Sequence, residues 1–106
     1  MTLTELYKAL MATGIPVAYR GSSSPVSAPY AVYYESRSDP IAGDLRTVAR
    51  WVTYRIELYT SGKDLTAEAK IETILDTLTS EYSKEEIELA GEKLLEIIYE
   101  FEGVET

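Results

Sequence analysis

Residues 51–60, which read WVTYRIELYT, limit the possible folds because core-like and surface-like side chains alternate along them. Successive side chains of an extended chain point to opposite faces of a sheet. One face would carry Val52, Tyr54, Ile56, Leu58 and Thr60. The other face would carry Trp51, Thr53, Arg55, Glu57 and Tyr59. The pattern predicts a strand over 50–61 with one buried face, and it leaves open what the second face contacts.

Two amphipathic helices are predicted on either side of this strand. The first covers 3–12, where Thr2 and Glu5 have the spacing of a capping box. The second covers 65–78, and Asp64 before it is a suitable N-cap. Both segments repeat leucine or isoleucine at helical spacing. We therefore expect each helix to bury one apolar stripe.

Three further strands are predicted over 16–19, 30–36 and 94–102, where β-branched and aromatic residues are frequent. Residues 37–49 contain a proline and a glycine and are long for a hairpin loop. They are predicted to be either a mobile arm or two extended strand ends joined by a turn near 40–44.

The last quarter of the chain allows two interpretations. A helix beginning near Ser83 would stack four glutamates at successive i,i+4 positions, which is unfavourable. A strand over 95–102 would point Leu95, Ile97, Tyr99 and Phe101 to one face, and Glu96, Ile98, Glu100 and Glu102 to the other. We favour the strand, and the structure of 83–93 stays undecided.

The chain has 106 residues, which is enough for one domain over 1–106. Its predicted elements follow the order helix, strand, strand, strand, helix, strand. Tight connections favour antiparallel neighbours. The predicted fold is therefore α+β, with an antiparallel sheet of about four strands and two helices packed on one face. The face that carries Trp51 is then left without a helix to cover it.

The composition excludes several kinds of catalytic and metal site. The chain has no cysteine and no histidine, so disulfides, thiolate metal sites and the usual general base near neutral pH are absent. The serines at 22–24 have no neighbouring base, and Glu85 and Glu86 are expected to form a solvated face rather than a cation site. We expect no enzymatic activity, no cofactor and no bound metal.

The formal charge of −8 disfavours nucleic acid and anionic membranes as direct partners. No segment approaches the roughly 20 apolar residues that a membrane span requires. The N-terminal residues MTLTELYKAL also lack the apolar run of a signal peptide. We expect a soluble protein made in a cytoplasm, with no membrane partner and no specific nucleic-acid partner.

The uncovered sheet face provides the candidate site. Trp, Tyr and Arg are enriched at the energetic centres of protein interfaces. The residues predicted to form a protein interface on this face are Tyr33, Trp51, Arg55, Glu57 and Tyr59. The alternative is an ordinary antiparallel sheet whose outer face meets water.

Four segments of the sequence carry a resemblance to a known family. GIPVAY, PYAVYY, YRIELYT and IIYEFE, in this order and with a helix before the last, resemble the tail completion proteins of long-tailed phages and prophages, also described as tail terminators or head–tail joining proteins. The LAGEKL stretch departs from that pattern. The resemblance implies a small α+β subunit without enzymatic activity. It implies a ring, commonly a hexamer, that caps the tail tube and presents it to the head connector in the virion.

A second class of function stays open on the residues alone. The carboxylates are concentrated after residue 81. Such a chain could be a small acidic protein that imitates DNA and inhibits a DNA-binding partner.

Overall fold

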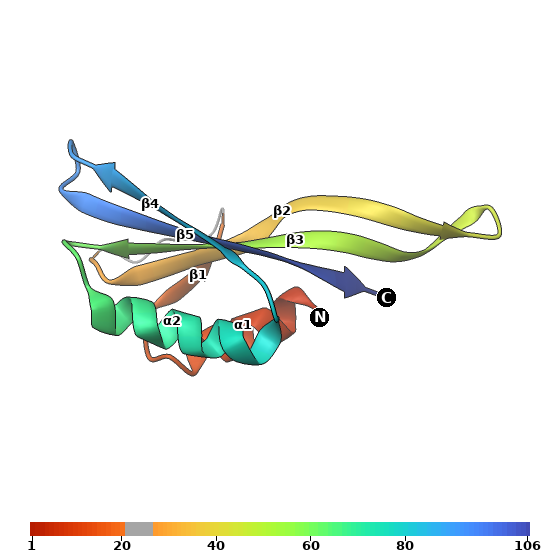
Figure 1. Cartoon of the computed structure of the whole chain (residues 1–106), viewed down its shortest axis with the longest axis horizontal. Coiled ribbons are helices and arrows are strands. Elements are labelled where there is room, and N and C mark those ends of the chain that lie inside the picture. The colour runs from red at the N-terminus through yellow and green to blue at the C-terminus, as the bar shows by residue number, and fades with distance from the viewer. Residues whose placement is uncertain (21–26) are drawn as a thin grey trace.

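The computed structural model describes residues 1–20 and 27–106. Its elements are α1 (Leu3–Met11), β1 (Val17–Tyr19), β2 (Tyr30–Gly43), β3 (Arg46–Thr60), α2 (Leu65–Leu78), β4 (Ser83–Leu89) and β5 (Leu94–Glu105). The strands form a five-stranded sheet in the order β1-β2-β3-β5-β4. Both helices lie on the same side of this sheet (Figure 1). The predicted α+β class and the predicted position of the helices are confirmed.

The core lies between the helices and one face of the sheet. Val52, Tyr54, Ile56, Leu58 and Thr60 of β3 are all buried, with at most 1% of each residue exposed. The helices contribute buried leucines and isoleucines, and β5 contributes Ile97, Tyr99 and Phe101. The alternation in β3 therefore predicts the buried face correctly, and the strand interpretation of 95–102 is confirmed.

The helix starts follow the capping chemistry predicted from the sequence. The Thr2 side chain accepts a hydrogen bond from the Glu5 amide at 3.2 Å, and Asp64 accepts one from the Ala67 amide at 3.0 Å. Each bond satisfies an amide that has no partner inside its helix. Both helices thus begin at residues that can be recognised locally, because capping depends only on neighbours in the sequence.

The predicted sheet is wrong in two respects. It has five strands rather than about four, because Ser83–Leu89 form β4 and pair antiparallel with β5. In addition, β1 pairs with β2 in parallel, so the sheet is mixed. Ten residues separate β1 from β2 in the sequence, so the pair is not joined by the two-residue turn that would make it an antiparallel hairpin.

Strand β4 lies at the edge of the sheet and is tied to α2 by ion pairs. The Lys84 ammonium lies 2.8 Å from a carboxylate oxygen of Glu68 and 2.8 Å from one of Glu72. Lys63 also lies 3.0 Å from the Glu68 carboxylate, and the Tyr99 hydroxyl donates to Glu72 at 2.8 Å. The Glu68 side chain is only 2% exposed, so these partners compensate the burial of its charge.

The ion pairs of Glu68 predict that the free energy of unfolding falls in acid. Burial alone would raise the pKa of Glu68, but the ammonium groups of Lys84 and Lys63 outweigh burial and lower it below its usual value of 4.5. A carboxylate whose pKa is lowered by folding stabilises the fold above its unfolded pKa, and this contribution disappears as pH falls through the folded pKa. Glu68→Gln should lower the free energy of unfolding at neutral pH by about 1–3 kcal/mol.

Urea titrations at a series of pH values check this expectation. The free energy of unfolding of Glu68→Gln should fall less between neutral pH and about pH 3 than that of the wild type. Glu88→Gln, which changes an exposed glutamate on the same sheet, is the control and should keep the wild-type pH dependence. If the free energy of unfolding depends on pH equally in the wild type and in Glu68→Gln, the stabilising role assigned to the Glu68 carboxylate is contradicted.

Strands β2 and β3 continue together as a hairpin that projects from the body of the molecule (Figure 1). We call residues 37–49 the arm. Asp44 and Leu45 form its turn with φ angles of 48° and 67°, as a two-residue hairpin turn with the twist of the sheet requires. The molecule measures 51 × 26 × 22 Å because of this extension. Of the two alternatives for 37–49, the structure has the extended strand ends.

Candidate protein-contact surface

The open face is the face of the sheet that points away from the helices. The structure places Trp51, Arg55, Glu57 and Tyr59 on this face, as the alternation in β3 predicts. Among the described residues, no helix covers it (Figure 1). We therefore treat the side chains that β3 and its neighbouring strands place on this face as one surface.

The prediction that Tyr33 lies on the open face is wrong. Tyr33 pairs with Ile56 on the helix side and is 8% exposed. Its ring contacts that of Tyr7 in α1, with 5.8 Å between centroids, and that of Tyr19 in β1, at 5.5 Å. The run YAVYY carries aromatic residues on both faces, so the pattern does not fix which face is buried.

Two other tyrosines of β2 occupy the open face instead. The ring of Tyr30 stacks on that of Tyr59 with centroids 4.9 Å apart. Tyr34 lies beside Arg55 in the register of β2 and β3, and the guanidinium of Arg20 covers its ring at 4.4 Å. Tyr34 is 7% exposed although it lies on the open face. The sequence gives no separate indication for Tyr30 and Tyr34, since their role depends on this register.

Arg55 and Glu57 are satisfied by contacts within the sheet. One carboxylate oxygen of Glu57 accepts from Arg55 Nε at 2.9 Å and from the Tyr34 hydroxyl at 2.8 Å. Its other oxygen lies 2.9 Å from the Tyr59 hydroxyl, which also lies 2.8 Å from Glu96. We call these five residues the Glu57 cluster. It gathers residues from β2, β3 and β5, so the centre of the open face is held in one arrangement.

The tyrosines of the Glu57 cluster keep their protons at physiological pH. Burial raises the pKa of Tyr59, and the neighbouring carboxylates of Glu96 and Glu57 raise it further. Burial also raises the pKa of Tyr34, and the hydrogen bond to Glu57 adds to the effect. Both hydroxyls are therefore hydrogen-bond donors rather than nucleophiles. Their geometry suits a recognition surface better than a site of covalent catalysis.

Trp51 lies on the same face but apart from the Glu57 cluster. It is 52% exposed. Arg55 is four positions further along the strand, which corresponds to about 13 Å. The open face thus has a rigid polar centre and, nearer the arm, a half-exposed aromatic side chain.

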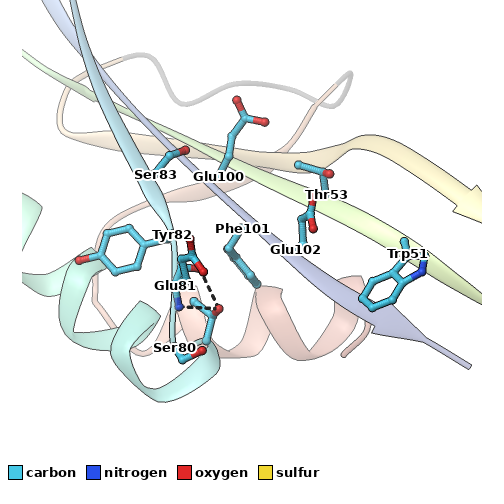
Figure 2. Close-up of a pocket in the computed structure, with 10 residues that line it drawn as sticks. Trp51, Thr53, Ser80, Glu81, Tyr82, Ser83, Glu100, Phe101 and Glu102 are labelled. Atoms are coloured by element: carbon cyan, nitrogen blue, oxygen red, sulfur yellow. Dashed lines mark hydrogen bonds between the residues drawn. The ribbon is translucent and has the colours of Figure 1, made fainter.

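A groove of about 670 Å³ runs from Trp51 around the edge of the sheet. Figure 2 shows Trp51 on one side of this groove and Tyr82 on the other, with Phe101 between them. The groove exists because β4 pairs with β5 only up to Glu100, so the chain leaving α2 borders the remainder of β5. The sequence gives no indication of it, because the register of β4 could not be predicted.

The groove is acidic. Its carboxylates are those of Glu81, Glu100 and Glu102, and none of the described residues that line it is a lysine or an arginine. Among the described residues, no group of three or more acidic side chains is arranged to hold a metal ion. The groove therefore suits a basic or polar segment of a partner, with Trp51 available to stack on a cation.

The remaining acidic and serine candidates do not come together as a site. Glu85 pairs beside Ile98 on the open-face side, whereas Glu86 points to the helix side and forms an ion pair with Lys63 at 2.6 Å. The serines at 22–24 lie outside the described residues. In the part of the chain that the structure describes, no helix has the length and apolar character needed to cross a membrane.

The sequence matches none of the protein-family models and none of the curated proteins with which it was compared.

Proposed function

We propose that this protein is a structural assembly protein of a phage or prophage tail, which caps the tail tube as a ring and mediates head–tail joining. The observation that carries the proposal is the open face, whose Glu57 cluster is ordered by hydrogen bonds and whose Trp51 is half exposed. The α+β architecture agrees with the fold that the resemblance implies. We propose the tail-tube protein and the head–tail connector proteins as partners, and the virion tail or neck as the location.

The Glu57 cluster supports a contact role because its side chains are already ordered. Binding normally costs about 0.5–1.5 kcal/mol for each flexible side chain that becomes immobilised. Arg55 and Tyr59 have lost much of this freedom in the free subunit, since both are bonded to Glu57. A partner that packs on their exposed atoms therefore meets a surface with a small remaining ordering cost.

The charge of the chain is compatible with a ring through which DNA passes. A ring requires that two different patches of each subunit meet and that the contact closes. The formal charge of −8 makes like subunits repel one another, so the ring should form more readily in salt or on the tail tube. An acidic wall also does not hold DNA that moves through the channel.

The second candidate, inhibition by DNA mimicry, has weaker support. Its best feature is the row of carboxylates on the open-face side of β5, of which Glu96 bonds Tyr59 and Glu100 lies 3.7 Å from Arg55. Ile98 interrupts this row between Glu96 and Glu100, and both of these carboxylates already have partners within the sheet, so few free charges remain to imitate phosphates. Titration of a DNA-binding protein at several salt concentrations discriminates, because mimicry should weaken steeply with salt.

Electron microscopy of purified tail tubes mixed with this protein tests the proposal. We expect rings on one end of the tubes, and tubes that no longer elongate when tube protein is added. Bovine serum albumin at the same concentration is the control for non-specific binding. A native protein that never associates with tube ends, over a range of salt and protein concentrations, would overturn the proposed function.

A further inference from the structure

We infer that the tip of the arm docks into an apolar groove between α1 and α2 of a second copy of this chain. This inference rests on the proposed ring and names the contact that joins its subunits. Three observations support it: an exposed leucine at the arm tip, a groove in the helix layer, and the placement of the two at opposite ends of the molecule.

Leu45 at the arm tip is unfavourable for the isolated subunit in two ways. Its φ angle of 67° belongs to the left-handed region, where glycine and asparagine are common and a bulky residue is an outlier. Its side chain is also fully exposed, at 104% of the reference area. Strained backbone persists where function requires it. A contact that buries Leu45 would compensate both costs.

The groove proposed to receive this side chain is a shallow one on the outer surface of the helices. It has a volume of about 640 Å³. Its apolar lining comes from Ala12, Leu65, Ala69 and Ile74. Leu65 is 70% exposed, so an apolar surface here faces water in the free subunit. Covering it with Leu45 and the nearby exposed Val48 would remove apolar surface from water on both partners.

The arm cannot reach the groove of its own chain. The arm projects from one end of the long axis, whereas α2 begins near the opposite end (Figure 1). The contact must therefore form between copies, with the tip of one subunit in the groove of the next. Such a head-to-tail contact uses two different patches, and it generates a ring when the rotation between subunits closes.

The charges are also favourable for this contact. The arm and Arg50 together hold three of the ten basic residues of the chain but only two of its 18 acidic residues, so this projection is not repelled by an acidic body. Asp44 precedes Leu45 at the tip, and Lys70 lines the groove. Docking would bring these two opposite charges near each other, which fixes the orientation of the tip.

Two single variants and their mixture test the contact. Leu45→Gly removes the anchor and relieves the left-handed strain, so it should fold at least as well as the wild type. Ala69→Glu places a charge in the groove at an exposed helix position. In sedimentation velocity at high salt, each variant alone should self-associate about thirtyfold more weakly than the wild type.

The mixture distinguishes this contact from a general loss of association. Leu45→Gly keeps an intact groove and Ala69→Glu keeps an intact tip, so together they should form complexes of two chains and nothing larger. Leu45→Met, which keeps an apolar tip, should associate as the wild type does. Wild-type association by Leu45→Gly alone, or a mixture that stays monomeric, would overturn the inference. A wild-type protein that stays monomeric up to its solubility limit would also overturn it, while rings on tube ends would still support the proposed function.

Discussion

Leu58→Asp is expected to unfold the domain. Leu58 has no exposed surface and lies between Ala31 of β2 and Ile97 of β5 on the helix side of the sheet. Aspartate at this position must either bury a charge without a partner or take up a proton, and both cost several kcal/mol. Domains of this size are stable by about 5–15 kcal/mol in total, so one such change removes much or all of the stability.

Circular dichroism and one-dimensional NMR at 25 °C check this result. Trp51→Asp provides the matched control, because it places the same charge on the same strand but on the open face, where the side chain is half exposed. We expect the control to stay folded and Leu58→Asp to lose dispersed amide resonances. A stable and soluble Leu58→Asp protein would mean that the two faces of β3 are assigned the wrong way round.

The parts of the fold that follow from local patterns could be predicted from the sequence. In β3, strict alternation separates core from surface, so the buried face was predicted correctly. The caps at Thr2 and Asp64 depend on residues three positions away and were also visible. The turn at the end of the arm could not be predicted, because it uses Asp44 and Leu45 rather than the glycine or asparagine that usually marks such a turn.

The parts that depend on pairing between distant segments could not be predicted. The sequence does not decide the structure of β4, because an edge strand of mixed lysine and glutamate has little apolar surface to reveal it. Strand β4 is held by pairing with β5 and by ion pairs such as that of Lys84 with Glu68, which form only once the distant segments pack together. The Glu57 cluster likewise needs the registers of β2 and β5 against β3, so the sequence alone neither identifies Tyr34 nor places Tyr33 on the correct face.

The double variant Trp51→Ala/Tyr59→Ala is expected to fold but to fail in tail completion. Truncation of an interface anchor often costs about 2 kcal/mol or more. The two residues are about 26 Å apart along β3, so their effects should add and weaken contact with the partner about a thousandfold. In a phage that lacks this gene, the double variant should yield full heads with unjoined or overlong tails, and very few infectious particles.

Two controls separate the loss of contact from other effects of the substitutions. Lys8→Ala truncates an exposed side chain of α1 that lies neither on the open face nor in the groove between the helices, and it should complement normally. Tyr59→Phe keeps the ring that stacks on Tyr30 and removes only the hydroxyl bonded to Glu57, so its defect should be smaller than that of Tyr59→Ala. If the folded double variant produces normal numbers of infectious particles, the open face does not take part in the contact. If only Trp51→Ala is defective, the contact lies at the arm end of the face, and the Glu57 cluster then serves to hold the sheet together.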